Sequence, residues 1–203
     1  HIDSARIKRG HLEPEEWKAL AAAGSRLGQL PIWIDDQPPR KIGPMRSVTR
    51  RHKRKHGVSM VVVDYVQQMG GDGNNRNNEI EEISRGLKAM ARELDVHVLA
   101  LAQLNRKVED RKPPRPMLSD LRDSGAIEQD ADNVLLLWRP EYYFDDRTPD
   151  AAKEQWRGKA EAILAKQRDG ETGRILMAWN APTLTFTQID ERASDYRIER
   201  RRA

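Results

Sequence analysis

The sequence contains no cysteine, and this absence excludes disulfide bonds and thiolate metal sites. No apolar run approaches the roughly 20 residues that cross a membrane, so we expect no membrane span. The chain opens HIDSARIKRG, which lacks the apolar core of a signal peptide. These absences together predict a cytoplasmic protein.

A further absence concerns nucleotide chemistry. The phosphate-binding loop pattern G-x-x-x-x-G-K-[ST] occurs nowhere in the 203 residues. The first residue is His1 and not Met, so we expect a fragment or a processed chain. A chain without this loop is expected to be inactive as an ATPase on its own.

The composition is polar for a globular domain. Hydrophobic residues make up 37% of the chain and charged residues 33%, so a large exposed surface or an interface is expected. The length is sufficient for one sizeable domain with a core. The net charge of +4 permits nucleic-acid binding without requiring it.

The most informative stretch is Val58–Met69, which reads VSMVVVDYVQQM. Its apolar, β-branched run predicts a strand buried on both faces, as in a parallel sheet between helices. Asp64 ends that run, and open α/β sheets bind ligands at the carboxyl ends of their strands. A carboxylate in this place is how an NTPase holds the magnesium of its nucleotide.

The rest of the chain alternates between helical and extended patterns and closes with a short antiparallel region. This order favours an α/β sandwich. We expect helices over 11–30, 44–56, 79–94, 124–129 and 150–158, and strands over 31–34, 58–63, 96–102, 133–138, 160–166, 172–178 and 184–188. The Gly/Asn-rich stretch between Met69 and Asn78 is predicted to be a mobile loop.

Five strings in a fixed order resemble the motor domain of DnaB-type replicative helicases. They are VVVDYVQQM, EIEEISRGLKAMARELDV, VLALAQLNR, SDLRDSGAIEQDAD and AKQRDG. The resemblance implies a RecA-like three-layer sandwich with a mainly parallel central sheet and an antiparallel C-terminal hairpin region. Residues 1–190 would be a partial motor domain without its phosphate loop, and 191–203 a charged flexible tail.

The same resemblance assigns residues around a nucleotide. Asp64 would order the water shell of Mg²⁺ bound to ATP, although a capping or salt-bridged Asp is the ordinary alternative. Gln103 would sit beside Asp64 and sense the nucleotide state, although strand-end amides often only satisfy loop backbone. Lys166 and Arg168 would reach the nucleotide of the adjacent subunit as an arginine finger, because Arg binds phosphate oxygens bidentately. A solvated hairpin end is the commoner fate of such a pair.

The resemblance also assigns residues to single-stranded DNA. Arg122, Asp123 and Gly125 would grip its backbone in the central channel, with Asp123 bonding through its main chain. The alternative is a loop salt bridge with a helix N-cap at Ser124. Arg76 would be a second channel contact or part of a plain mobile loop. The basic run between Arg46 and Lys55 is interpreted as a solvated helix face.

The function implied by this resemblance is ATP-dependent unwinding of duplex DNA by a homo-hexameric helicase at the replication fork. Its expected partners are single-stranded DNA, a primase and a helicase loader, with ATP and Mg²⁺ as cofactors. Two other classes stay open. One is a RecA-like recombinase or regulatory ATPase, and the other is a non-catalytic module that binds DNA or a helicase.

Overall fold

A computed structural model describes residues 2–37, 41–70 and 75–189 of the chain, without the side chains of residues 122–124. The described residues form two compact units. One unit contains residues 2–36, 139–161 and 175–189, and the other contains the described residues of 37–138 together with 162–174. The predicted tail over 191–203 lies outside the described residues.

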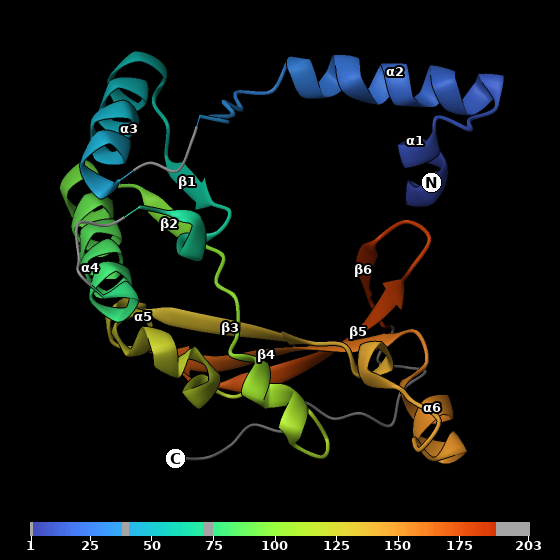
Figure 1. Cartoon of the computed structure of the whole chain (residues 1–203). Helices are drawn as coiled ribbons and strands as arrows, with labels where there is room; N and C mark the ends of the chain where they lie inside the picture. Colours follow the sequence, from blue (N-terminus) through green and yellow to red (C-terminus); the bar gives the residue numbers. More distant parts are fainter. Residues whose placement is uncertain (1, 38–40, 71–74, 190–203) are drawn as a thin grey trace. The chain divides into compact units, whose positions relative to one another are not determined.

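The second unit is built on two parallel strands and the helices beside them. Strands β1 (Met60–Val63) and β2 (His97–Ala100) pair in parallel, with Val63 opposite Ala100. Figure 1 shows helices α3 (Ile42–His56) and α4 (Arg76–Leu94) beside these strands. The apolar stripe of α4 supplies much of the core, through Ile83, Leu87, Met90 and Leu94. This spacing of three and four residues turns one face of the helix to the strands.

The prediction that these strands are buried on both faces is wrong for the described structure. Val63 is buried, whereas the alternate residues Met60 and Val62 are about half exposed. In β2, Leu99 is exposed, while Val98 packs against the core. Successive side chains of a strand point to opposite faces, and the described helices bury only the face that carries Val61 and Val63.

The remaining strands form a four-stranded sheet in the order β3-β4-β5-β6. Their bounds are Asn133–Trp138, Lys159–Gln167, Gly173–Asn180 and Thr185–Gln188. Strands β5 and β6 pair antiparallel, as the C-terminal hairpin prediction requires. On β3, Val134 and Leu136 join Leu121 in a second apolar cluster of the second unit, while Leu135 and Leu137 are exposed.

The first unit contains helices α1 (Ser4–Arg9), α2 (Pro14–Gly28) and α6 (Asp150–Trp156). The backbone N–H of Ser4 donates to the carbonyl of Pro182 at 2.8 Å, so α1 is tied to the turn before β6. The guanidinium of Arg139 lies over the rings of Tyr142 and Trp179, at 5.3 and 4.8 Å from their centroids. These cation–π contacts fix the chain where it leaves β3.

Most predicted elements are present with small shifts at their ends. Helix α3 ends at Gly57 in the left-handed conformation (φ 70°), which glycine adopts without strain. The predicted strand over 31–34 is wrong, because these residues are irregular and Ile34 is 88% exposed. Within the described ranges, no helix is both long and apolar enough to cross a membrane.

Candidate functional site

Asp64 lies at the carboxyl end of β1, immediately after Val63. Its side chain is exposed, and among the described residues it has no hydrogen-bond or ion-pair partner. The capping or salt-bridged alternative therefore finds no support in this part of the chain. A carboxylate free at a strand end is available to a ligand.

Gln103 lies at the same edge of the sheet, three residues beyond β2. The side chain of Gln67 spans the two strand ends. Its Nε2 donates to the carbonyl of Gln103 at 3.1 Å, and its Oε1 accepts from the N–H of Gln103 at 3.1 Å. This double bridge holds the backbone of Gln103 near the Asp64 turn and leaves the Gln103 side chain exposed.

Arg76, at the start of α4, returns to the same turn. Its guanidinium donates to the carbonyls of Gln67 and Met69 and pairs with Glu79 at 2.6 Å. These bonds fix both ends of the loop whose residues 71–74 lie outside the described part. The guanidinium of Arg76 is thus bonded within its own chain, and it connects the loop to the Gln67–Gln103 bridge.

Lys166 lies near the end of β4 and caps helix α5 (Gly125–Asp130). Its Nζ donates to the carbonyls of Glu128 at 2.6 Å and Gln129 at 3.2 Å. A cation at the carboxyl end of a helix satisfies unpaired carbonyls and opposes the negative end of the helix dipole. Lys166 therefore joins the strand end to the helix that follows the predicted DNA loop.

Arg168 lies in the turn after β4 and pairs with Asp132. Its Nη1 is 3.3 Å from Oδ1 of Asp132, and its backbone N–H donates to the Asp132 carbonyl at 2.9 Å. Asp132 also pairs with Lys88 of α4. The hydrogen bond from Lys88, with a smaller contribution from Arg168, lowers the pKa of Asp132. The Arg168 side chain is still 59% exposed.

The long loop before α5 is held by an ion pair between Arg111 and Asp120. Nη1 of Arg111 is 2.8 Å from Oδ1 of Asp120, and Nη2 pairs with Oδ2. Asp120 is buried, and its carboxylate also accepts from the N–H of Met117 at 2.8 Å. The bond from Arg111 lowers the pKa of Asp120 although burial opposes it. This pair fixes the loop just before the predicted DNA contacts.

Gly125 is the first residue of α5, with φ −51° and ψ −27°. Any residue adopts these angles, and a Cβ added here would meet no atom within 4 Å. The fold therefore does not require glycine at this position, which leaves room for a ligand to approach the backbone. The side chains of Arg122 and Asp123 lie outside the described part of the structure.

The site offers few ligands for a metal ion. The described residues contain no group of three His, Asp or Glu side chains that would hold one. Mg²⁺ commonly takes one or two carboxylates and completes its shell with water and substrate phosphates. Asp64 alone fits that role.

Two residues of this region have no role in the sequence interpretation. Gln67 lies three positions after Asp64, in the string VVVDYVQQM, and Asp132 lies in SDLRDSGAIEQDAD. The partners of these two side chains lie 36 positions away or more along the chain. Only the folded structure shows that these residues, distant along the chain, are in contact.

The sequence matches the family described as DnaB-like helicase C terminal domain over residues 1–188. It is 41% identical over 201 residues to the replicative DNA helicase DnaB of Geobacillus stearothermophilus, covering 98% of this chain and 43% of that protein. It is 40% identical over 198 residues to the replicative DNA helicase DnaC of Bacillus subtilis, covering 96% and 42%. The chain thus spans less than half the length of these relatives.

The structure is also similar to solved structures of helicase ATPase domains. One of them, described as an ATPase domain, matches with a TM-score of 0.82 and 39% identity, over 93% of this chain and 66% of that one. A DnaB-like replicative helicase, solved in a study of its interactions with primase, matches with the same TM-score and identity, over 93% and 45%.

Proposed function

Because this chain belongs to the DnaB-like helicase C-terminal domain family and has its RecA-like α/β fold, we propose that it is part of the motor of a hexameric, ATP-dependent replicative DNA helicase. The observation that carries the proposal is the pair of free side chains at one sheet edge. Asp64 and Gln103 follow two neighbouring parallel strands, and Gln67 holds the two strand ends together.

Asp64 is the residue that would hold Mg²⁺ with its nucleotide. Its carboxylate is exposed and unpartnered among the described residues, so it can order the water around the ion without first breaking an ion pair. When bound, Mg²⁺ neutralises charge on the phosphates of ATP. Gln103 lies beside it with a free amide, suited to sensing whether the terminal phosphate is present.

Arg168 is proposed as the arginine finger for the nucleotide of the adjacent subunit, with Lys166 beside it. In this structure Arg168 pairs with Asp132, and its side chain is 59% exposed. An ion pair this exposed contributes only about 0–1 kcal/mol, so exchanging the carboxylate for phosphate oxygens costs little. Lys166 is held by two carbonyls of α5, so it positions the strand end on which Arg168 is carried.

The DNA contact is proposed for the segment from Arg122 to Gly125. The Arg111–Asp120 pair fixes this segment on one side, and α5 follows on the other. Lys166 contacts the far end of the same helix, so the proposed finger and the proposed DNA segment share one short element. Contacts to phosphates rather than base edges make such binding independent of sequence.

The longer relatives supply the remaining parts of the proposal. A primase partner is suggested by the DnaB-like replicative helicase studied with primase, and a helicase loader is proposed as a further partner. The protein is proposed to act in the cytoplasm on single-stranded DNA. The family match disfavours the recombinase alternative, whereas the missing phosphate-loop pattern favours the non-catalytic module for this chain taken alone.

ATP turnover of the full-length protein, with and without single-stranded DNA, tests this function. Asp64→Asn and Arg168→Ala are each expected to lower turnover by about a thousandfold or more, because each removes charge that stabilises phosphoryl transfer. Gln67→Ala is expected to keep basal turnover and lose its stimulation by DNA. Wild-type turnover in Arg168→Ala, in oligomers of normal size, contradicts the finger assignment.

A further inference from the structure

Helix α3 concentrates positive charge more strongly than any other described helix. It contains no Asp or Glu, and its Lys and Arg residues are Arg46, Arg50, Arg51, Lys53, Arg54 and Lys55. The structure divides these cations into two groups. Arg46 and Arg50 pair with Glu93 of α4, and Lys53 donates to the Asp95 carbonyl at 2.6 Å.

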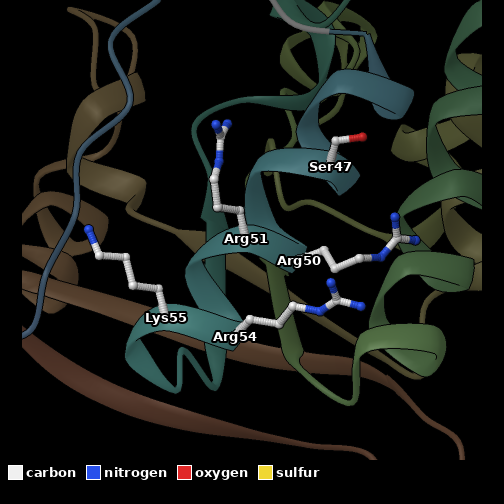
Figure 2. Close-up of a pocket in the computed structure, with 5 residues that line it drawn as sticks. All are labelled: Ser47, Arg50, Arg51, Arg54 and Lys55. Atoms are coloured by element: carbon white, nitrogen blue, oxygen red, sulfur yellow. The ribbon is translucent and has the colours of Figure 1, made fainter.

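The second group is Arg51, Arg54 and Lys55. All three side chains are exposed, and none has a hydrogen-bond or ion-pair partner among the described residues. Together with Ser47 and Arg50 they line an open hollow of about 400 Å³. Figure 2 shows Arg50 and Arg54 extending to the right of the view, while Arg51 and Lys55 extend away from them. We refer to Ser47, Arg51, Arg54 and Lys55 as the basic stripe.

The like charges on α3 contribute to a lowered pKa at His56, the last residue of the helix. The pKa of His56 is lowered, first by partial desolvation and then by the charges of Lys55 and His52. Unneutralised cations on one helix repel one another, and a bound polyanion removes that repulsion. The side chains are therefore in an arrangement that an anionic ligand would stabilise.

The position of the basic stripe separates it from the site at the strand ends. Helix α3 runs through Gly57 into the amino-terminal end of β1, and Lys53 contacts Asp95, just before β2. Asp64 and Gln103 lie at the opposite, carboxyl ends of these two strands. The stripe thus lies at the other edge of the parallel sheet.

The side chains favour a phosphate backbone over an acidic protein partner. Protein interfaces depend on a few apolar or aromatic anchors, and no large apolar side chain of α3 is exposed. A phosphate backbone requires only cations and hydrogen-bond donors, and the planar guanidinium of Arg suits phosphate oxygens. From Ser47 to Lys55 the stripe extends about 12 Å, a length over which duplex DNA presents about seven phosphates.

We propose that the basic stripe of α3 is a second DNA-binding site, which takes the sugar–phosphate backbone of DNA outside the channel that the helicase proposal assigns to Arg122 and Gly125. The site is sequence-independent, because it has groups for phosphates and none placed for base edges. It lies on the part of the sheet remote from the nucleotide, so its contribution to DNA binding does not depend on ATP.

The test is the salt dependence of DNA binding by the full-length protein, measured by fluorescence anisotropy. The variant Arg51→Gln/Arg54→Gln/Lys55→Gln is compared with Lys8→Gln/Arg9→Gln/Arg26→Gln, a control that removes three exposed cations from α1 and α2. Both changes lower the net charge from +4 to +1. Gln keeps a good helix propensity, so both proteins are expected to fold.

The expected result is a slope of log K against log salt that is shallower by about 2.7 for duplex DNA, or by about 2 for single strands, in the α3 variant only. The form of DNA, duplex or single-stranded, for which the slope changes more is the form that the stripe prefers. If the triple variant does not fold, the single variant Arg51→Gln replaces it, and about a third of the change in slope is expected. ATP turnover without DNA is expected to stay unchanged in both.

Equal slopes in the wild type and the α3 variant overturn the proposal. Equal losses in the α3 variant and the control also overturn it, because they show a net-charge effect only. Binding of polyglutamate by the same proteins tests whether the occupant is an acidic protein. If the α3 variant loses polyglutamate binding and keeps DNA binding, the occupant is an acidic protein and the DNA site is wrong. These outcomes are independent of the ATP-turnover test of Arg168 and Asp64, so failure of the second DNA site leaves the proposed function untouched.

Discussion

The ion pair between Arg111 and Asp120 depends on the ionised form of a buried carboxyl. Because the pKa of Asp120 is lowered in the folded state, the unfolded chain binds more protons in acid. The stability that this carboxylate contributes is present above its unfolded pKa, near 3.9, and is lost as the pH falls through the lower folded value. The loop before Gly125 is thus fixed at neutral pH and released in strong acid.

Asp120→Asn is expected to lower the free energy of unfolding by about 1.5–3 kcal/mol at pH 7, because the hydrogen bonds to Arg111 lose their charge. The measurement is chemical denaturation between pH 7 and pH 3, where the variant is expected to lose less stability than the wild type. Asp110→Asn removes a nearby exposed carboxylate and is expected to change stability by less than about 0.5 kcal/mol. Equal effects of the two substitutions would contradict the role of Asp120.

Gly125→Ala separates a structural role from a binding role. The backbone angles suit alanine, and its Cβ would meet no atom within 4 Å. We therefore expect stability to stay the same or rise by up to about 1 kcal/mol. Affinity for single-stranded DNA is expected to fall severalfold, because the methyl group keeps the phosphates away from the backbone. Gly24→Ala in α2, also without neighbours, serves as the control in the same anisotropy assay.

The residues that end each strand are easier to predict from the sequence than the side-chain bonds between separate elements. The order of Asp64 and Gln103 at the ends of two strands could be predicted from the strand patterns. The bridge through Gln67 and the pairing of Asp132 with Lys88 and Arg168 could not, because they depend on the three-dimensional register of separate elements. No local pattern of charge or hydrophobicity records such a register.

At the scale of elements, α3 and α4 meet at a glycine. A Cβ on Gly86 of α4 would lie 3.2 Å from the Cβ and the Cγ2 of Ile42 in α3, with Cγ1 closer still. Gly86→Ala is therefore expected to cost about 1–2 kcal/mol in thermal unfolding, since overpacking outweighs the gain in helix propensity.

The control is Gly43→Ala, one residue after Ile42. Apart from its chain neighbours, its Cβ would meet no atom within 4 Å, whereas Pro44 disfavours a Cβ on the helical residue before it, so this change is expected to shift stability by less than about 1 kcal/mol in either direction. The two substitutions add the same methyl group to the same pair of helices. A stabilising effect of Gly86→Ala would show that α3 and α4 do not pack as described.

Element prediction succeeds where the pattern is long and clearly bounded. Helix α3 is marked by Gly57 and α4 by its apolar stripe, and β3 is predicted with both ends correct. The prediction for the short apolar run over 31–34 is wrong, because four residues resemble a strand whether or not another strand pairs with them. The expectation that both faces of β1 are buried is wrong for a related reason. A run of apolar residues does not determine whether another element covers each face of the strand.

For the whole molecule, the family and the fold follow from five strings in order, and the comparisons confirm both. The activity remains a proposal, because the chain spans less than half the length of the curated relatives it matches. In the proposed motor the nucleotide site is shared between subunits: Asp64 comes from one subunit and Arg168 from the next. A shared site predicts complementation between subunits that are defective in different halves of it.

The most direct measurement is ATP turnover by mixed oligomers of full-length Asp64→Asn and Arg168→Ala proteins. Each variant alone is expected to be inactive, whereas random mixing creates about a quarter of interfaces with both residues intact. A site shared between subunits gives recovered turnover in this mixture, and none when Asp64→Asn is mixed with the double variant Asp64→Asn/Arg168→Ala. No recovery in oligomers shown to contain both single variants would contradict a site shared between subunits.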